Sequence, residues 1–154
     1  MKIIAHRGNI NGPDSNLENH PSQVELAISQ RFDCEIDLYY SKDNFYLGHD
    51  APNHLVSIEW LLEHRDSLWI HCKNYSALDK FIEIGESFNF FWHQKDDFTL
   101  TSTNLIWTFP GQKVGQKSIL VLPELYIDFK EIGKEIMKKV YGVCTDYPSR
   151  FVNE

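Results

Sequence analysis

The stretch CEIDLYYSKDNFYLGHD, residues 34–50, predicts a buried strand followed by a hairpin arm. Residues two apart in a strand point to the same face, so Glu35 and Asp37 project together. On the other face, Ile36 and Leu38 need burial against helices, which directs the two carboxylates toward an interior. The four-residue turn SKDN then leads into the apolar run at 44–49, which we interpret as a hairpin arm. Two acidic groups inside a buried strand are costly unless something pairs with them.

The rest of the chain alternates between short apolar runs and helical patterns. Runs typical of strands lie at 2–6, 34–40, 44–49, 67–73, 88–94, 103–109, 117–123 and 141–145, and helical patterns at 20–32, 57–66, 76–87 and 128–140. Residues 93–107 have no helical period and predict a bare connection. Strand–helix alternation indicates a parallel sheet, hence the α/β class. Because a complete barrel of this kind needs about 250 residues, we expect one domain, 1–154, forming a reduced (β/α) TIM-type barrel with some helices missing or shortened.

Composition excludes several classes of protein. The net charge is 15 − 22 = −7 and no run of Lys or Arg occurs, so we expect no nucleic-acid partner. No long apolar stretch is present, so we expect no membrane span, and the opening MKIIAHRG does not resemble a signal peptide. Cys34, Cys72 and Cys144 lack metal-ligand spacing, which favours structural cysteines and a reducing, cytoplasmic location. An acidic chain that handles an anion needs a metal or a few well-placed cations.

Ionisable residues stand where five of the predicted strands end. They are His6, then Glu35 and Asp37, then His71 and Lys73, then His93, and finally Glu124. In parallel barrels the residues at the carboxyl ends of the strands form the functional site. The sequence therefore predicts a site at this end of the sheet. Asp146 is interpreted as a turn and packing residue, Asn19 as an anchor of the first loop, and the functional or structural role of Trp107 is left open.

Four segments resemble one known family. The segment IAHRGN (4–9) is similar to the HRG motif of the glycerophosphodiester phosphodiesterase family, and LENHPSQVELAI (17–28) is similar to the segment before its first helix. Residues 34–50 are similar to its E-x-D strand with the H-D loop, and GVCTDYPSR (142–150) is similar to its closing T-D-x-P. The resemblance covers the first fifty residues and the last fifteen. It implies a barrel that hydrolyses a small-molecule phosphodiester with a divalent cation, in lipid metabolism.

The same resemblance implies roles for individual residues. His6 and His49 match the acid–base pair, Arg7 matches the phosphate clamp, and Glu35 and Asp37 match two metal ligands. Carboxylate oxygens suit Mg²⁺ or Ca²⁺.

The third metal ligand of that family is a glutamate in an E-x-K pattern, but this chain has His71-Cys72-Lys73. Either His71 binds the metal through nitrogen, which would admit Mn²⁺, or Glu124 takes its place. Lys73 remains a phosphate partner.

Two alternatives to hydrolysis stay open. A neighbouring substrate hydroxyl could attack the phosphorus and give a cyclic phosphate, as phosphoinositide-type phospholipases do. The domain could instead be a non-catalytic module that binds a phosphorylated sugar or polyol, a reading favoured by the missing glutamate at position 71. Exposed aromatic residues leave an oligomer open as well.

Overall fold

The computed structural model describes residues 1–85, 88–129 and 138–151 and has an α/β architecture. The strands are β1 (Lys2–Ala5), β2 (Asp33–Ser41), β3 (Asn44–Leu47), β4 (His54–Val56), β5 (Leu68–Cys72), β6 (Phe90–Trp92), β7 (Phe98–Leu100), β8 (Ile106–Thr108), β9 (Ser118–Val121) and β10 (Gly142–Thr145). The helices are α1 (Pro21–Ser29), α2 (Ile58–His64) and α3 (Tyr75–Ile84), with 3₁₀ turns η1 (His6–Gly8), η2 (Pro123–Leu125) and η3 (Pro148–Phe151).

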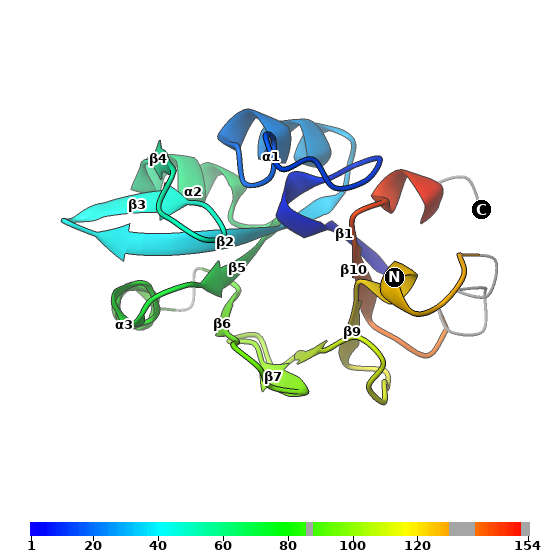
Figure 1. Cartoon of the computed structure of the whole chain (residues 1–154). Helices are drawn as coiled ribbons and strands as arrows, with labels where there is room; N and C mark the ends of the chain where they lie inside the picture. Colours follow the sequence, from blue (N-terminus) through cyan, green and yellow to red (C-terminus); the bar gives the residue numbers. More distant parts are fainter. Residues whose placement is uncertain (86–87, 130–137, 152–154) are drawn as a thin grey trace.

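All of these strands belong to one sheet. Neighbouring strands in the order β6-β5-β2-β1-β10-β9-β8 are parallel, and β7 is added antiparallel to β8. The second half of β2 also carries the antiparallel strands β3 and β4. In Figure 1 the strands follow a curve from β5 and β6 past β7 to β9 and β10, with α1, α2 and α3 on its outside. Among the described residues no strand ladder joins β6 to β7, so the sheet is not closed into a barrel.

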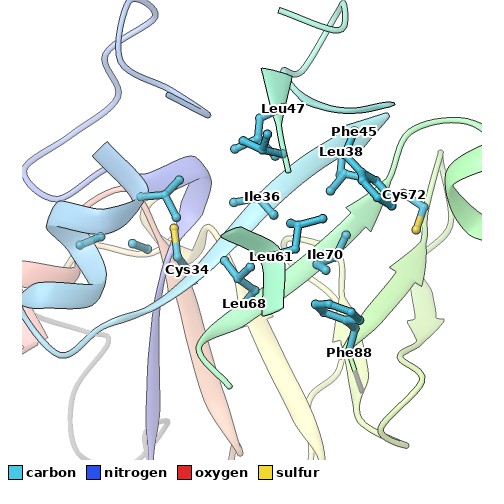
Figure 2. Close-up of a cluster of buried hydrophobic side chains, with 14 of the residues drawn as sticks. Cys34, Ile36, Leu38, Phe45, Leu47, Leu61, Leu68, Ile70, Cys72 and Phe88 are labelled. Carbon is cyan, nitrogen blue, oxygen red and sulfur yellow. The ribbon is translucent and has the colours of Figure 1, made fainter. Parts of the chain in front are cut away.

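The outer face of β2 and β5 forms the main core. Ile36, Leu38 and Ile70 are fully buried there and pack with Leu61 of α2, as Figure 2 shows. This packing confirms that the apolar face of residues 34–40 is covered by helices, and it turns Glu35 and Asp37 to the opposite side of the sheet.

The three cysteines are free and buried. Burial raises the pKa of the Cys72 thiol to about 12 and raises the pKa values of Cys34 and Cys144 well above the usual value. Thiols in this state pack as small apolar groups, as the sequence predicts.

The predicted elements agree with most of the fold. The strands, the hairpin arm at β3 and three of the four helices are confirmed, with Ser57 and Asn74 accepting the capping hydrogen bonds of α2 and α3. The connection at 93–107 contains no helix, as predicted, but the short strand β7 lies within it and was not predicted. Strand β4 was not predicted, and both missed strands have only three residues, too few to show a period. Most of the predicted helix at 128–140 falls outside the described residues.

Within the described ranges, no helix is long and apolar enough to cross a membrane.

Candidate functional site

A cavity of about 560 Å³ opens where the parallel strands end. One side of it is lined by charged and imidazole side chains from β2, from β5 and its end, from the turn after β1 and from the loop after β3. They are His6, Arg7, Glu35, Asp37, His49, His71 and Lys73. Seven of the eight predicted site residues therefore meet in one place, and the eighth, Glu124, does not line the cavity.

The turn after β1 positions Arg7. The backbone of Arg7 is left-handed (φ 52°), and Gly8 follows with φ 80°. A Cβ at Gly8 would lie 3.3 Å from the backbone nitrogen of Val24, so the turn also needs a glycine for close packing on α1. The Arg7 amide donates to Glu35 Oε2 at 3.1 Å. Non-glycine residues adopt this conformation only where the surroundings enforce it, and such strain concentrates at functional sites.

Asp37 lies at the centre of the charged side. Its Oδ1 is 3.0 Å from His71 Nδ1 and 3.3 Å from Lys73 Nζ, and its Oδ2 is 3.1 Å from His49 Nδ1. Arg7 Nε lies 3.1 Å from the same Oδ2 as an ion pair, without the alignment of a hydrogen bond. Burial raises the pKa of Asp37, but hydrogen bonds from His49 and His71 outweigh it and hold this pKa well below its usual range. Asp37 is therefore a carboxylate at neutral pH.

Asn19 fixes the orientation of Asp37. Its Nδ2 donates to Asp37 Oδ2 at 3.0 Å, and its Oδ1 accepts from the Asp37 amide at 2.8 Å. Asn19 is buried, with a left-handed backbone. The expectation that it anchors the first loop is confirmed, and the partner is the site itself.

Glu35, Asp37 and His71 could hold a metal ion. One ligand atom from each lies within 4.8 Å of the others, and both carboxylates are buried. Burial and then the charge of Asp37 raise the pKa of Glu35, so this carboxylate benefits from an added positive charge. A carbonyl can only accept, so His71 Nε2 donates to His93 O at 2.9 Å and leaves Nδ1 facing the carboxylates. This backbone bond to the far ring nitrogen is the usual support of a metal-binding histidine, so the residues fit a divalent cation.

Glu124 is engaged elsewhere. Its Oε1 accepts from Thr145 Oγ1 and from the Asp146 amide, both at 2.8 Å. Among the described residues, the three-donor cluster contains His71 and not Glu124. This placement favours His71 over Glu124 as the third ligand, because η2 directs Glu124 to the end of β10, where its Oε2 is buried without a hydrogen-bond partner among the described residues.

His6 is paired with Asp146. Its Nδ1 lies 2.8 Å from Asp146 Oδ1, and Asn9 Nδ2 donates to the same oxygen at 2.8 Å. Since the carboxylate accepts, Nδ1 carries the proton, and the described residues offer no hydrogen bond to Nε2. Burial lowers the pKa of His6, but the bond to Asp146 and the charge of Glu35 outweigh it, and the pKa is raised. Burial raises the pKa of Asp146, but the bond from His6 outweighs it, and that pKa is lowered.

Two partners of the site were missed in the sequence. Asp146 was read only as a turn and packing residue, although the parallel pairing of Ala5 with Thr145 sets it beside His6. Glu18 accepts from Arg7 Nη1 at 3.0 Å and from Asn9 Nδ2 at 3.2 Å. Glu18 lies in LENH and Asp146 lies in TDYP, two motifs that carried the family resemblance. That resemblance is the one signal that could have identified them as site residues.

We expect Asp146→Asn to reduce stability in a pH-dependent way. Because the pKa of His6 is raised in the folded state, its pairing with Asp146 contributes fully to stability below about pH 6.5. This contribution is lost as the pH rises through the folded-state pKa of His6. Because the pKa of Asp146 is lowered in the folded state, this residue contributes to the stability of the fold above about pH 3.9. The contribution is lost as the pH falls through the folded-state pKa of Asp146. The difference in unfolding free energy should be about 1–3 kcal/mol near pH 5 and clearly smaller at pH 9. Urea unfolding at both pH values measures it, and an equal difference at both would contradict the pairing.

The loop that carries His49 depends on Gly48. Gly48 has φ 150°, and a Cβ there would collide with the carbonyl oxygen of Ala51. We expect Gly48→Ala to cost about 1–3 kcal/mol of unfolding free energy and to displace His49 from Asp37. Thermal unfolding checks the cost, with Gly115→Ala as control because no atom lies within 4 Å of a Cβ there. Equal melting temperatures for the two variants would contradict the expectation.

Comparisons with known proteins give the site no counterpart. No protein-family model, no curated protein and no solved structure matches the chain.

Proposed function

We propose that the chain is a metal-dependent phosphodiester hydrolase acting on a glycerophosphodiester or a related polyol or sugar phosphodiester. One observation carries the proposal: two buried carboxylates and the imidazole of His71 lie together in a cavity that is also lined by two cations and by three further histidines, among them His6 and His49. The first group suits a divalent cation, the second a phosphate, and the third proton transfer. The resemblance of the HRG, E-x-D and H-D segments points to the same reaction.

We also propose that the sheet is a reduced (β/α) TIM-type barrel. Seven strands run parallel, and the cavity lies at their carboxyl ends, where such barrels carry their sites. Between β6 and the β7 region, the Ser102 amide donates to Phe90 O at 2.8 Å and Thr99 Oγ1 donates to Trp92 O at 2.7 Å. These bonds bring the two ends of the sheet together where a further helix and strand would stand in a complete barrel.

In this proposal Glu35, Asp37 and His71 hold the cation, Mg²⁺, Ca²⁺ or Mn²⁺. When bound, the cation polarises a phosphoryl oxygen and neutralises part of the diester charge. Nitrogen from His71 beside two carboxylates favours Mn²⁺ more than an all-oxygen site would.

Arg7 and Lys73 bind the phosphate. The guanidinium can bind two phosphate oxygens with its planar fork, although in this structure its Nη1 donates to Glu18 at 3.0 Å and its Nη2 lies 2.8 Å from His49 Nδ1. Lys73 Nζ lies 3.3 Å from both Asp37 Oδ1 and His49 Nδ1, so its charge faces the same part of the cavity. Arg7 and Lys73 already pair with carboxylates, so a diester must compete with these carboxylates for the two cations.

His6 and His49 move the protons. Asp146 favours the imidazolium form of His6, so we assign His6 the role of the acid that donates a proton to the leaving alcohol. The side chain of His49 is 39% exposed and is therefore open to solvent. We assign it the role of the base that accepts a proton from the attacking water. The presence of both His6 and His49 weighs against the non-catalytic binding module, because a binding protein has little use for an acid–base pair.

The test is an assay of purified protein on bis-p-nitrophenyl phosphate and on glycerophosphodiesters with Mg²⁺, Ca²⁺ or Mn²⁺. Turnover that needs the metal and is lost in the His6→Ala/His49→Ala double variant supports the proposal. Phosphorus NMR of the products separates open phosphate monoesters from the cyclic phosphate of the cyclising alternative. No turnover above the double variant with any of these ions would refute the hydrolase.

A further inference from the structure

The cavity has two chemically different sides. Opposite the charged side, its lining comes from the ends of β6, β8 and β9, from the loop after β8 and from η2. That lining is apolar: Trp92, Trp107, Phe109, Val121, Leu122 and Leu125. In the strand order, β1 and β10 stand between β2 and β9, whereas β6 pairs directly with β5, so the two sides adjoin where Trp92 pairs with Cys72.

The deep part of the apolar side is rigid. Trp107 is 5% exposed and stacks on Phe91, with ring centroids 4.5 Å apart. Trp69 packs behind it at 6.0 Å. Buried aromatic rings that hold one another in place form a fixed surface for an apolar group.

The outer part of this side exposes hydrocarbon to water. Phe109 is 45% exposed and Leu125 is 68% exposed, and both line the cavity. Their exposure places them at the outer part of the cavity, whereas Trp107 is buried. Large apolar side chains gathered at the mouth of a polar site mark a surface that a ligand covers.

Hydroxyl groups would find few partners on this side. His93 and Gln94 are the polar side chains that accompany the apolar lining there. A polyol placed against this surface would lose its hydrogen bonds to water and would find few groups besides His93 and Gln94 in the described lining to replace them, which is unfavourable.

We propose that the phosphodiester carries an alkyl or acyl chain and that this chain lies against the apolar side while the phosphate lies among Arg7, Lys73 and the carboxylates. The inference rests on the proposed function and narrows its substrate from any glycerol-type diester to an amphipathic one. Each methylene removed from water is worth up to about fourfold in binding. A chain that reaches from the phosphate to Leu125 therefore raises affinity strongly.

The test uses diesters of glycerol phosphate with methanol, n-butanol and n-octanol, kept below micelle-forming concentrations. We expect kcat/KM, followed by phosphorus NMR, to rise by about tenfold or more from methyl to octyl. Phe109→Ser and Leu125→Ser should flatten this rise. Leu55→Ser is the matched control, because Leu55 is 63% exposed on β4 and does not line the cavity. Turnover that is independent of chain length would overturn the inference and leave the hydrolase standing.

A binding measurement separates the inference from the reaction. Methyl phosphate and n-octyl phosphate are monoesters, so their binding can be measured by calorimetry whether or not the chain hydrolyses diesters. Octyl phosphate binding about tenfold or more tighter than methyl phosphate, with the gain lost in Leu125→Ser, supports the apolar subsite even if no diester is turned over. Equal binding of the two phosphates would overturn it.

Discussion

Replacing His6 by Ala is expected to lower kcat/KM for a phosphodiester by about 10²–10⁴-fold. The reason is the loss of a proton donor held at one place by Asp146, 2.8 Å from its Nδ1. A positioned acid of this kind contributes to the rate only through the transition state, so kcat should fall far more than KM rises.

A second substitution separates chemistry from folding. His6→Asn retains an N–H that can donate to Asp146 but removes Nε2, so the dyad contact survives and the proton donor does not. We expect its activity to be as low as that of His6→Ala and its melting temperature to be closer to the wild type. His64→Ala is the control, since His64 lies at the end of α2 and does not line the cavity. A His6→Asn protein within about tenfold of wild-type activity would contradict the role given to His6.

The second large effect is expected at Asp37. Asp37→Asn keeps the shape of the side chain but removes the charge that faces Arg7, Lys73, His49 and His71. Lys73 would then lose its carboxylate partner and Arg7 would keep only Glu18, and the loss of one partner of a buried ion pair costs about 3–5 kcal/mol. Removing one of two carboxylate ligands also weakens metal binding.

Urea unfolding and calorimetric titration with Mn²⁺ measure the two consequences of Asp37→Asn. Asp43→Asn is the matched control, because Asp43 is exposed in the turn after β2. We expect the control to unfold and to bind metal as the wild type does. An Asp37→Asn protein that is as stable as the wild type and binds Mn²⁺ equally well would contradict the account of the site.

The sequence predicted the central part of this site because that part is local. Glu35 and Asp37 share a face for the same reason that Ile36 and Leu38 share the other, and the alternation of a buried strand shows this directly. His71 and Lys73 follow by the same rule on β5, where Asp37 pairs with His71 across the parallel ladder. Hydrophobic alternation and strand ends were therefore enough to gather His6, Glu35, Asp37, His71 and Lys73, whereas Arg7 and His49 were predicted from the family resemblance alone.

What the sequence did not reveal depends on contacts between distant segments. The pairing of His6 with Asp146 spans 140 positions and follows from the register of β1 against β10, which no local pattern encodes. Glu124 is the opposite case, a residue that was predicted to join the cluster and that a contact with a distant segment keeps away from it. It ends a predicted strand like the other candidates, but the short turn η2 directs its carboxylate to Thr145 and away from the cluster.

The short strand β7 shows why the sheet was harder to predict than the site. Its three residues alternate between exposed and partly buried positions, and so short an alternation cannot be distinguished from a loop. Its pairing with β8 is antiparallel, whereas the strand–helix alternation elsewhere predicts parallel neighbours.

The central claim is that Glu35, Asp37 and His71 together bind one divalent cation. The most direct test is a crystal structure of the protein soaked in Mn²⁺, with the metal located by its anomalous scattering. The account predicts a single strong peak within about 2.6 Å of an oxygen of each carboxylate and of His71 Nδ1. A peak at other residues, or no peak at this cluster under saturating Mn²⁺, would contradict it.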